Sequence, residues 1–468
     1  MIFGVLMGVL VGVLPGMGGI VGLSVLLPFI YGMEPYAGVA LLIGMAAVIH
    51  TSDTFPSVLM GIPGSSGSQA TILDGYPLAQ KGEASRALGA GFISSMFGGI
   101  IGGIVLFATV PVFRPVILAF GSPELFMLAL LGLSMVGVLS GKSPIKGMII
   151  GALGLMVGAI GGAPAVATYR YTFGVLYLYD GVPLAVVALG LFAFPEMVDL
   201  LVKKKSIASA SSPTGGIMQG FRDVLQHKWL MFWNAMLGAL VGFIPGLGAS
   251  VVSWINYGVT RQFCKNNETF GQGDIRGVIA PESGNNAKEG GSLIPTLMFG
   301  IPGSATAAVI LGGLILMGIQ PGTRMVTTEL PILFSIIWTL VLANIFGVIV
   351  CLLLTKPITR LCFIPATKLV PFIMLILVIG AYQSSRHWGD IIAFIAFGLL
   401  GWFMKHFNWP RPPLLIGFVL ATATERYLWI SMSRYGFQWL TFPGVIIIGV
   451  ATLIVMWVGY LLKRGAEA

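Results

Sequence analysis

Two helix-breaking motifs occur twice in this chain, at matching places. Gly12-Val-Leu-Pro-Gly-Met-Gly18 returns as Gly242-Phe-Ile-Pro-Gly-Leu-Gly248, and Gly61-Ile-Pro-Gly-Ser65 returns unchanged as Gly300-Ile-Pro-Gly-Ser304. Proline and glycine interrupt helices because proline lacks an N–H and glycine loses the most conformational freedom on ordering. The motifs keep their order at offsets of 230 and 239 residues. The repetition predicts a duplicated chain whose two homologous halves contain the same breaks.

The chain is too apolar for an aqueous fold. Hydrophobic residues make up 56% of it and charged residues 9%, with a mean hydropathy of +0.94, whereas soluble domains are about 25% charged. We therefore expect an all-α integral membrane protein with roughly 10–12 membrane segments. The apolar start lacks a basic region and is not expected to be a signal peptide. Uncharged runs long enough to span a membrane cover 1–33, 87–113, 147–169, 229–260, 290–323, 330–355 and 435–462.

The net charge of +9 is concentrated at the ends of the apolar runs. This is the positive-inside pattern of membrane proteins, so no nucleic-acid partner is expected. Lys203, Arg222 and Lys228 place the segment around them in the cytoplasm, with a flexible Ser-rich middle. The three cysteines have no CxxC spacing, so neither a disulfide nor a metal role is expected. The expected sections are membrane repeat one at 1–200, a basic linker at 201–228, membrane repeat two at 229–462 and a cytoplasmic tail at 463–468.

A polar stretch precedes each copy of Gly-Ile-Pro-Gly-Ser. The first is His50-Thr-Ser-Asp-Thr54 and the second is Pro281-Glu-Ser-Gly-Asn-Asn-Ala-Lys-Glu-Gly290. Each lies about 11 to 18 residues from the motif, which is too short for a separate membrane pass. We therefore expect each stretch to form one limb of a re-entrant hairpin with the motif near its tip. The alternative is that the stretches are water-exposed loops and that the glycines serve only close helix packing.

The breaks and the polar stretches supply groups that a transported solute could use. A half-helix N-terminus attracts a carboxylate, and freed backbone carbonyls suit Na⁺. Asparagine can donate to a carboxylate and also offer a carbonyl oxygen to a cation. Charged residues within a membrane, such as Glu282 and Lys288, are usually functional, whereas His50 is more typical of a hydrogen-bonded cavity histidine. We expect substrate contacts from Gly64, Ser65, Ser66, Asn285, Asn286, Gly303, Ser304 and Thr306, and a coupling Na⁺ or H⁺ at Asp53, Thr54, Gly16 and Gly246.

Signs of enzymatic chemistry are weak. Gly141-Lys142-Ser143 resembles the end of a phosphate-binding loop, but Val136 stands where that pattern requires glycine. No metalloprotease motif, paired aspartate motif or nucleophile triad is evident, so neither an enzyme nor a cofactor is expected. Two alternatives remain open besides a transporter. One is a channel or scaffold whose pore is lined by the same segments, and a more distant one is an intramembrane enzyme.

Five motifs in order resemble the large membrane subunit of the tripartite tricarboxylate transporters, across nearly the whole chain. Each motif alone is modest, but their order is specific. They are the first Pro-Gly motif, Leu73-Asp-Gly-Tyr-Pro-Leu-Ala-Gln-Lys-Gly82, Ala280-Pro-Glu-Ser-Gly-Asn-Asn-Ala287, Met298-Phe-Gly-Ile-Pro-Gly-Ser-Ala305 and Gly318-Ile-Gln-Pro-Gly322.

The resemblance implies a bacterial inner-membrane permease that imports a carboxylate, such as a tricarboxylate, by symport on an ion gradient. It implies two partners, a small four-helix membrane subunit and a periplasmic solute-binding protein. Relatives usually have a further hydrophobic segment before the first motif, whereas this chain starts almost on that motif, as expected of a start that is either truncated or misannotated. They also have a Tyr-Gly-Gly-Ser-Thr-like run where this chain has Ile49-His-Thr-Ser-Asp-Thr-Phe55.

Duplicated transporters place equivalent breaks around one shared site. We therefore predict that 61–66 and 300–306 approach one another near the membrane midplane. We also predict inverted repeats, with residue 229 entering from the cytoplasm and residue 1 starting on the periplasmic side.

Overall fold

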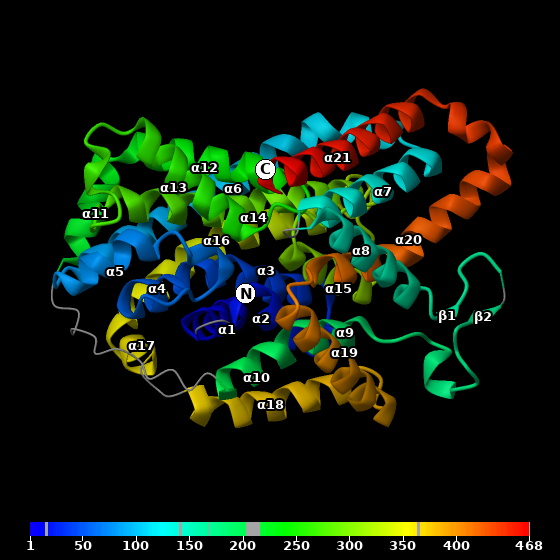
Figure 1. Cartoon of the computed structure of the whole chain (residues 1–468), viewed down its shortest axis with the longest axis horizontal. Coiled ribbons are helices and arrows are strands. Elements are labelled where there is room, and N and C mark those ends of the chain that lie inside the picture. The colour runs from blue at the N-terminus through cyan, green and yellow to red at the C-terminus, as the bar shows by residue number, and fades with distance from the viewer. Residues whose placement is uncertain (15–16, 140–142, 167, 203–215, 363–365, 468) are drawn as a thin grey trace.

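The computed structural model describes residues 1–467 except 15–16, 140–142, 167, 203–215 and 363–365. The described chain is almost entirely helical (Figure 1). Within it, the short strands β1 (Gly161–Gly162) and β2 (Tyr169–Arg170) pair antiparallel in a loop that projects beside the helices. The expected all-α membrane fold class is confirmed.

The first half of the chain contains ten α-helices within the described residues. They are α1 (Ile2–Val13), α2 (Gly18–Ile30), α3 (Pro35–Ser52), α4 (Thr54–Met60), α5 (Ile72–Gln80), α6 (Ala84–Ala119), α7 (Ser122–Leu139), α8 (Pro144–Gly158), α9 (Leu184–Ala188) and α10 (Phe194–Val202). Three short helical turns accompany them, η1 (Ser66–Ser68), η2 (Leu176–Leu178) and η3 (Leu189–Ala193).

The second half follows the linker. Its helices are α11 (Ile217–Gln226), α12 (Lys228–Phe243), α13 (Ala249–Phe263), α14 (Arg276–Phe299), α15 (Ala305–Leu316), α16 (Leu330–Leu353), α17 (Thr355–Cys362), α18 (Ala366–Gln383), α19 (Trp388–His406), α20 (Pro412–Tyr435) and α21 (Pro443–Glu467). Its short turns are η4 (Asn267–Thr269) and η5 (Gly436–Thr441).

Many of these helices have the length and composition of membrane spans. Among the described residues, five helical segments are long and apolar enough to cross a membrane, and seven shorter helices of 10–17 residues are also apolar. The chain is therefore a multi-pass membrane protein, and the estimate of roughly 10–12 passes stays a prediction. The five long segments are Pro35–Met60, Ala84–Ala119, Leu330–Leu353, Trp388–His406 and Pro412–Thr441.

Both Pro-Gly motifs interrupt a helix, as expected. α1 ends at Val13 and α2 begins at Gly18, while α12 ends at Phe243 and α13 begins at Ala249. Gly16, one of the expected cation ligands, lies outside the described residues. The middle of the expected linker at 206–215 also lies outside them, whereas the end of that linker forms α11.

In each half, the helix before the Pro-Gly motif packs on its partner in the same way. A Cβ atom added to Gly12 would lie 2.5 Å from the carbonyl oxygen of Ile49, and one added to Gly242 would lie 2.5 Å from that of Lys288. Residues 49 and 288 are 239 positions apart, the same offset as the Gly-Ile-Pro-Gly-Ser motifs. The α1–α3 and α12–α14 pairs therefore use equivalent close contacts between backbones.

A long helix of each half also packs against the polar helix of the other half. α6 of the first half packs on α14 of the second, and α16 of the second half packs on α3 of the first. Glycines allow these approaches, since a Cβ atom on Gly98 would lie 2.1 Å from the carbonyl oxygen of Ser283. The polar helix of each half is thereby covered by the other half, and neither half forms a separate unit.

The Gly-Ile-Pro-Gly-Ser motifs form helix–turn–helix connections. α4 ends before Gly61 (φ +63°) and α14 ends before Gly300 (φ +68°), both in the left-handed conformation that glycine adopts easily. The polar stretch of the second half lies inside the 24-residue helix α14, which leads directly to the second motif, and the expected re-entrant hairpins stay a prediction. Pro281 and Pro295 remove only their own hydrogen bonds, and the buried packing keeps the helix continuous.

Asp74 fixes α5 to the loop before α14. Its Oδ1 atom accepts hydrogen bonds from the backbone N–H groups of Gly271, Gly273 and Asp274, each at 2.8 Å. Its Oδ2 atom accepts one from the Tyr257 hydroxyl at 2.9 Å. The fully buried carboxylate therefore satisfies donors that would otherwise lose their partner.

We expect Asp74→Ala to lower stability by about 1.5–3 kcal/mol, because hydrogen bonds to a buried charged group are lost. The melting temperature of the purified protein in detergent measures this loss. Asp180→Ala is the matched control, because Asp180 is exposed. Equal melting temperatures for the two variants would show that the hydrogen bonds to Asp74 contribute nothing to stability.

Candidate functional site

The turn that follows α4 packs directly against Asp53. A Cβ atom on Gly64 would lie 2.7 Å from the Asp53 Cβ atom, so only glycine fits there. The Gly64 N–H donates to the Ser57 hydroxyl at 3.4 Å, and that hydroxyl donates to the Asp53 carbonyl oxygen at 2.8 Å. The expected site residue Gly64 thus holds backbone directly against the Asp53 side chain.

The second half repeats this turn with equivalent residues. The Gly303 N–H donates to the Thr296 hydroxyl at 3.1 Å, which donates to the Ser292 carbonyl oxygen at 2.6 Å. A Cβ atom on Gly303 would lie 2.7 Å from the same carbonyl oxygen. Ser292 stands 239 positions after Asp53. The two turns therefore have equivalent hydrogen bonds. They differ in one respect, because only the turn of the first half packs against a carboxylate side chain, that of Asp53.

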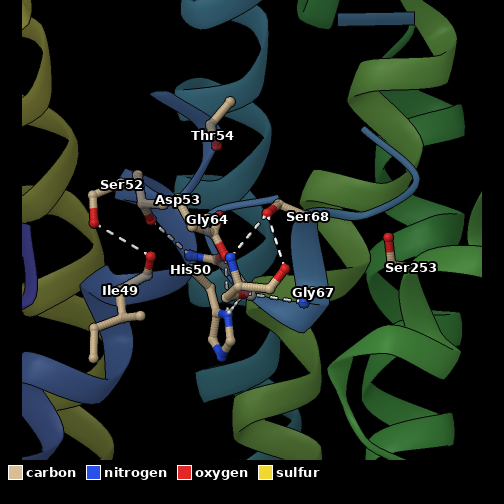
Figure 2. A network of polar contacts seen from close by, with 12 residues as sticks. Ile49, His50, Ser52, Asp53, Thr54, Gly64, Gly67, Ser68 and Ser253 are labelled. Carbon is tan, nitrogen blue, oxygen red and sulfur yellow. Dashed lines mark hydrogen bonds and ion pairs between the residues drawn. The ribbon is translucent and has the colours of Figure 1, made fainter. Parts of the chain in front are cut away.

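A buried charged cluster lies beside these breaks, and Figure 2 shows two of its members, His50 and Asp53. The His50 Nδ1 atom lies 3.5 Å from Asp53 Oδ2, and His50 Nε2 lies 3.0 Å from Glu289 Oε1. Lys288 Nζ contacts the same Glu289 oxygen. The Ser65 hydroxyl donates to Asp53 and lies 3.4 Å from His50 Nδ1. No member of this cluster is more than 6% exposed.

Equivalent positions of the two repeats meet at this cluster. His50 and Glu289 are 239 residues apart and contact each other. Ala47 and Asn286 have the same spacing, and the Asn286 amide donates to the Ala47 carbonyl oxygen at 3.4 Å. Mutual contact between equivalent positions is characteristic of a two-fold relation. Whether the repeats are inverted relative to the membrane stays a prediction.

The two Gly-Ile-Pro-Gly-Ser breaks have neighbours in common, and their direct approach stays a prediction. Ser65 of the first break contacts His50, which contacts Glu289 on the helix leading to the second break. A Cβ atom on Gly19 would lie 3.5 Å from Thr306 and 3.9 Å from His50. The two breaks thus share neighbours, and their position at the membrane midplane stays a prediction.

Several buried polar atoms in this region have no hydrogen-bond partner within the described structure. They include both side-chain polar atoms of Asn285, together with Asp53 Oδ1, Glu289 Oε2 and Asn286 Oδ1. Buried polar groups are nearly always hydrogen-bonded. A concentration of free donors and acceptors between two helix breaks is therefore typical of a ligand site.

The two adjacent asparagines have different roles. Asn286 donates to the Thr51 hydroxyl and to Asn344 Oδ1, both at 2.8 Å, and so joins three helices. Asn285 instead faces the segment after the first break, because a Cβ atom on Gly67 would lie 2.3 Å from its Oδ1 atom. Both are buried, which contradicts the alternative that this polar stretch is a water-exposed loop.

Glu282 forms a second polar centre, whose hydroxyl partners the sequence did not reveal. Its carboxylate accepts hydrogen bonds from the hydroxyls of Thr71 at 2.6 Å and of Thr54 and Ser95 at 3.0 Å. Thr54 therefore binds Glu282 rather than the His50 cluster. The polar stretch around Glu282 was a usable signal, but nothing in the sequence marks Thr71 or Ser95.

The remaining expected site residues lie at the edge of the cluster or outside it. Ser304 caps α15 by accepting the Ala307 N–H at 3.1 Å. The Gly246 N–H donates to the Gly303 carbonyl oxygen at 3.1 Å, which joins the Pro-Gly break to the second motif. Ser66 is exposed, in contrast to buried Ser65, and is not brought into the charged cluster.

Comparison with known proteins is consistent with this architecture. Residues 1–416 match the model of the tripartite tricarboxylate transporter TctA family. The chain is 32% identical to an Agrobacterium vitis protein described as an uncharacterized 52.8 kDa protein in the TAR-I ttuC' 3'region, over 91% of this chain and 85% of that protein. It is 37% identical to a second Agrobacterium vitis protein, from the TAR-II ttuC' 3'region, over 41% of this chain and 79% of that protein. No solved structure matches the chain.

The family match covers both copies of each motif and the helices that carry the buried cluster. The chain therefore belongs to the tripartite tricarboxylate transporter TctA family.

Proposed function

We propose that this chain is the permease subunit of a binding-protein-dependent system that imports a carboxylate across the bacterial inner membrane. A small four-helix membrane subunit and a periplasmic solute-binding protein would be its partners. The observation that carries the proposal is the set of unpartnered buried polar atoms between the two helix breaks. Family membership supports a transport role for that set.

The groups around the breaks suit a carboxylate. The free Asn285 amide can donate to a carboxylate oxygen. The N-terminus of α15 begins directly after the second break at Ser304, and its partial positive charge favours an anion. Lys288 and His50 lie nearby, each in contact with a carboxylate of the chain. An anionic substrate would thus meet donors from both halves of the chain.

The same region also requires cations. Asp53 and Glu289 offset Lys288 and His50 within the cluster, so a carboxylate brings negative charge without compensation. Buried charge is costly unless it is paired. Co-transport of Na⁺ or H⁺ would supply the missing charge, which favours a symporter over a channel.

We expect gradient-driven, saturable uptake when the chain is reconstituted in liposomes with its small membrane subunit and binding protein. Radiolabelled di- and tricarboxylates are supplied outside, with an inward Na⁺ gradient or an inward proton gradient applied separately. Liposomes without the chain and liposomes with both gradients collapsed are the controls. Uptake that rises linearly with substrate and ignores both gradients would instead indicate a channel.

A further inference from the structure

Glu282 lies apart from the proposed carboxylate-binding atoms, and its carboxylate is fully buried. Glu282 and its three hydroxyl partners are each fully buried. Thr54 and Thr71 come from the segments flanking the first break, and Ser95 comes from α6. In Figure 2, Thr54 lies on the opposite side of Asp53 from the His50 ring. This centre is thus distinct from the His50 cluster and joins three segments of repeat one to α14 of repeat two.

Glu282 has no positive partner among the described residues. No lysine, arginine or histidine nitrogen of those residues lies within 4.0 Å of its carboxylate. Two basic residues of the packed helices bind other carboxylates, because Lys288 contacts Glu289 and Arg86 binds Asp223 at 2.6 Å. An isolated carboxylate buried in this way is strongly unfavourable until it is neutralised.

The charges of the packed helices leave the centre negative. α3 carries His50, Asp53 follows its last residue, and α14 carries Glu282, Lys288 and Glu289. Three carboxylates therefore face one lysine and, at most, one protonated histidine. At least one negative charge remains uncompensated. On α5, buried Asp74 adds a further carboxylate, which is occupied by four donors of its own.

The ligand atoms around Glu282 are all oxygens. Hard cations such as Na⁺ prefer carboxylate and hydroxyl oxygens to nitrogen donors. Each hydroxyl now points its proton at the carboxylate, but rotation about its C–O bond would turn a lone pair to a cation instead. The all-oxygen lining therefore suits an alkali-metal cation.

We propose that Glu282, with the hydroxyls of Thr54, Thr71 and Ser95, forms a binding site for the coupling cation, and that this cation is Na⁺. The inference rests on the proposed symport function and assigns its ion to named residues. Because the ligands come from both repeats, the bound cation ties α14 to the first break. Cation binding would thereby stabilise the arrangement in which Asn285 faces that break.

The test measures cation binding without any carboxylate present. The melting temperature of the full chain in detergent is recorded against NaCl, KCl and choline chloride at constant ionic strength. A ligand that binds only the folded state raises stability with its concentration, so Na⁺ should raise the melting temperature in a saturable way. Glu282→Gln should abolish the Na⁺ response.

Two smaller changes keep the test decisive if Glu282→Gln fails to fold. Ser95→Ala and Thr71→Val should each weaken apparent Na⁺ affinity about tenfold or more, because one ligand to a charged group is lost. Ser94→Ala is the matched control, since Ser94 is a neighbouring buried serine on the same helix whose hydroxyl does not contact Glu282. It should retain the wild-type response.

Either of two outcomes would overturn the assignment. One is a wild-type Na⁺ response in Ser95→Ala and Thr71→Val. The other is a wild-type protein whose melting temperature responds to pH but not to Na⁺ at any pH tested. Uptake assays separate this failure from failure of the proposed function. Carboxylate uptake without Na⁺ binding rejects only the ion site, whereas Na⁺ binding without carboxylate uptake rejects the transport proposal.

Discussion

Asn285→Ala is expected to reduce uptake about ten- to hundredfold at subsaturating substrate, through loss of a hydrogen bond to a charged ligand. The variant should fold normally, because neither polar atom of the Asn285 side chain bonds to the protein. Uptake into liposomes and the melting temperature are measured on the same preparation. The combination of lost uptake and retained stability is the signature of a ligand-contacting residue.

Asn286→Ala provides the matched comparison. Asn286 holds Thr51 and Asn344, so its removal should lower the melting temperature as well as uptake. Ser94→Ala controls for removal of any unpartnered buried polar group from the site region. Wild-type uptake by Asn285→Ala across subsaturating substrate and cation concentrations would remove this residue from the site.

Gly290→Val is expected to prevent the two halves from packing. A Cβ atom at this position would lie 2.2 Å from the carbonyl oxygen of Gly102, and the neighbouring helix backbone would have to move. Overpacking of a core typically costs about 1–3 kcal/mol, and a clash with backbone exceeds what a side chain can relieve. We expect aggregated or poorly expressed protein, measured by size-exclusion chromatography in detergent.

Gly258→Ala is the matched control for that variant. Gly258 also lies within a helix, but a Cβ atom there would meet nothing within 4 Å. Alanine is the better helix former, so this change should leave the protein folded or slightly stabilise it. A monodisperse Gly290→Val protein with a normal melting temperature would contradict the observed contact between α6 and α14.

Composition and duplication determined the fold class in advance. Long uncharged runs can satisfy their backbone groups in lipid only as helices, and Pro-Gly pairs must break those helices. The places of Gly61 and Gly300 at helix ends followed from these rules. The polar stretches also predicted a functional site, because charged residues within a membrane are energetically costly and occur there mainly where function requires them.

The tertiary structure decided which polar residues meet. No local rule shows that equivalent positions 50 and 289 would contact each other across the repeats, or that Asn285 and Asn286 would have separate roles. The helix α14 continues through Pro281 because α6 and α12 pack against it. Helix propensity, which describes local sequence alone, does not predict this packing.

The sequence by itself determined that this is a duplicated helical membrane protein, with breaks and polar stretches at fixed places. Hydrophobicity and helix-breaking residues act locally along the chain, so they can be read in order. Only the tertiary structure placed Thr71 and Ser95 around Glu282. Thr71 and Ser95 are 211 and 187 positions from Glu282 along the chain. They contact Glu282 only because helices of the first half pack against α14 of the second half.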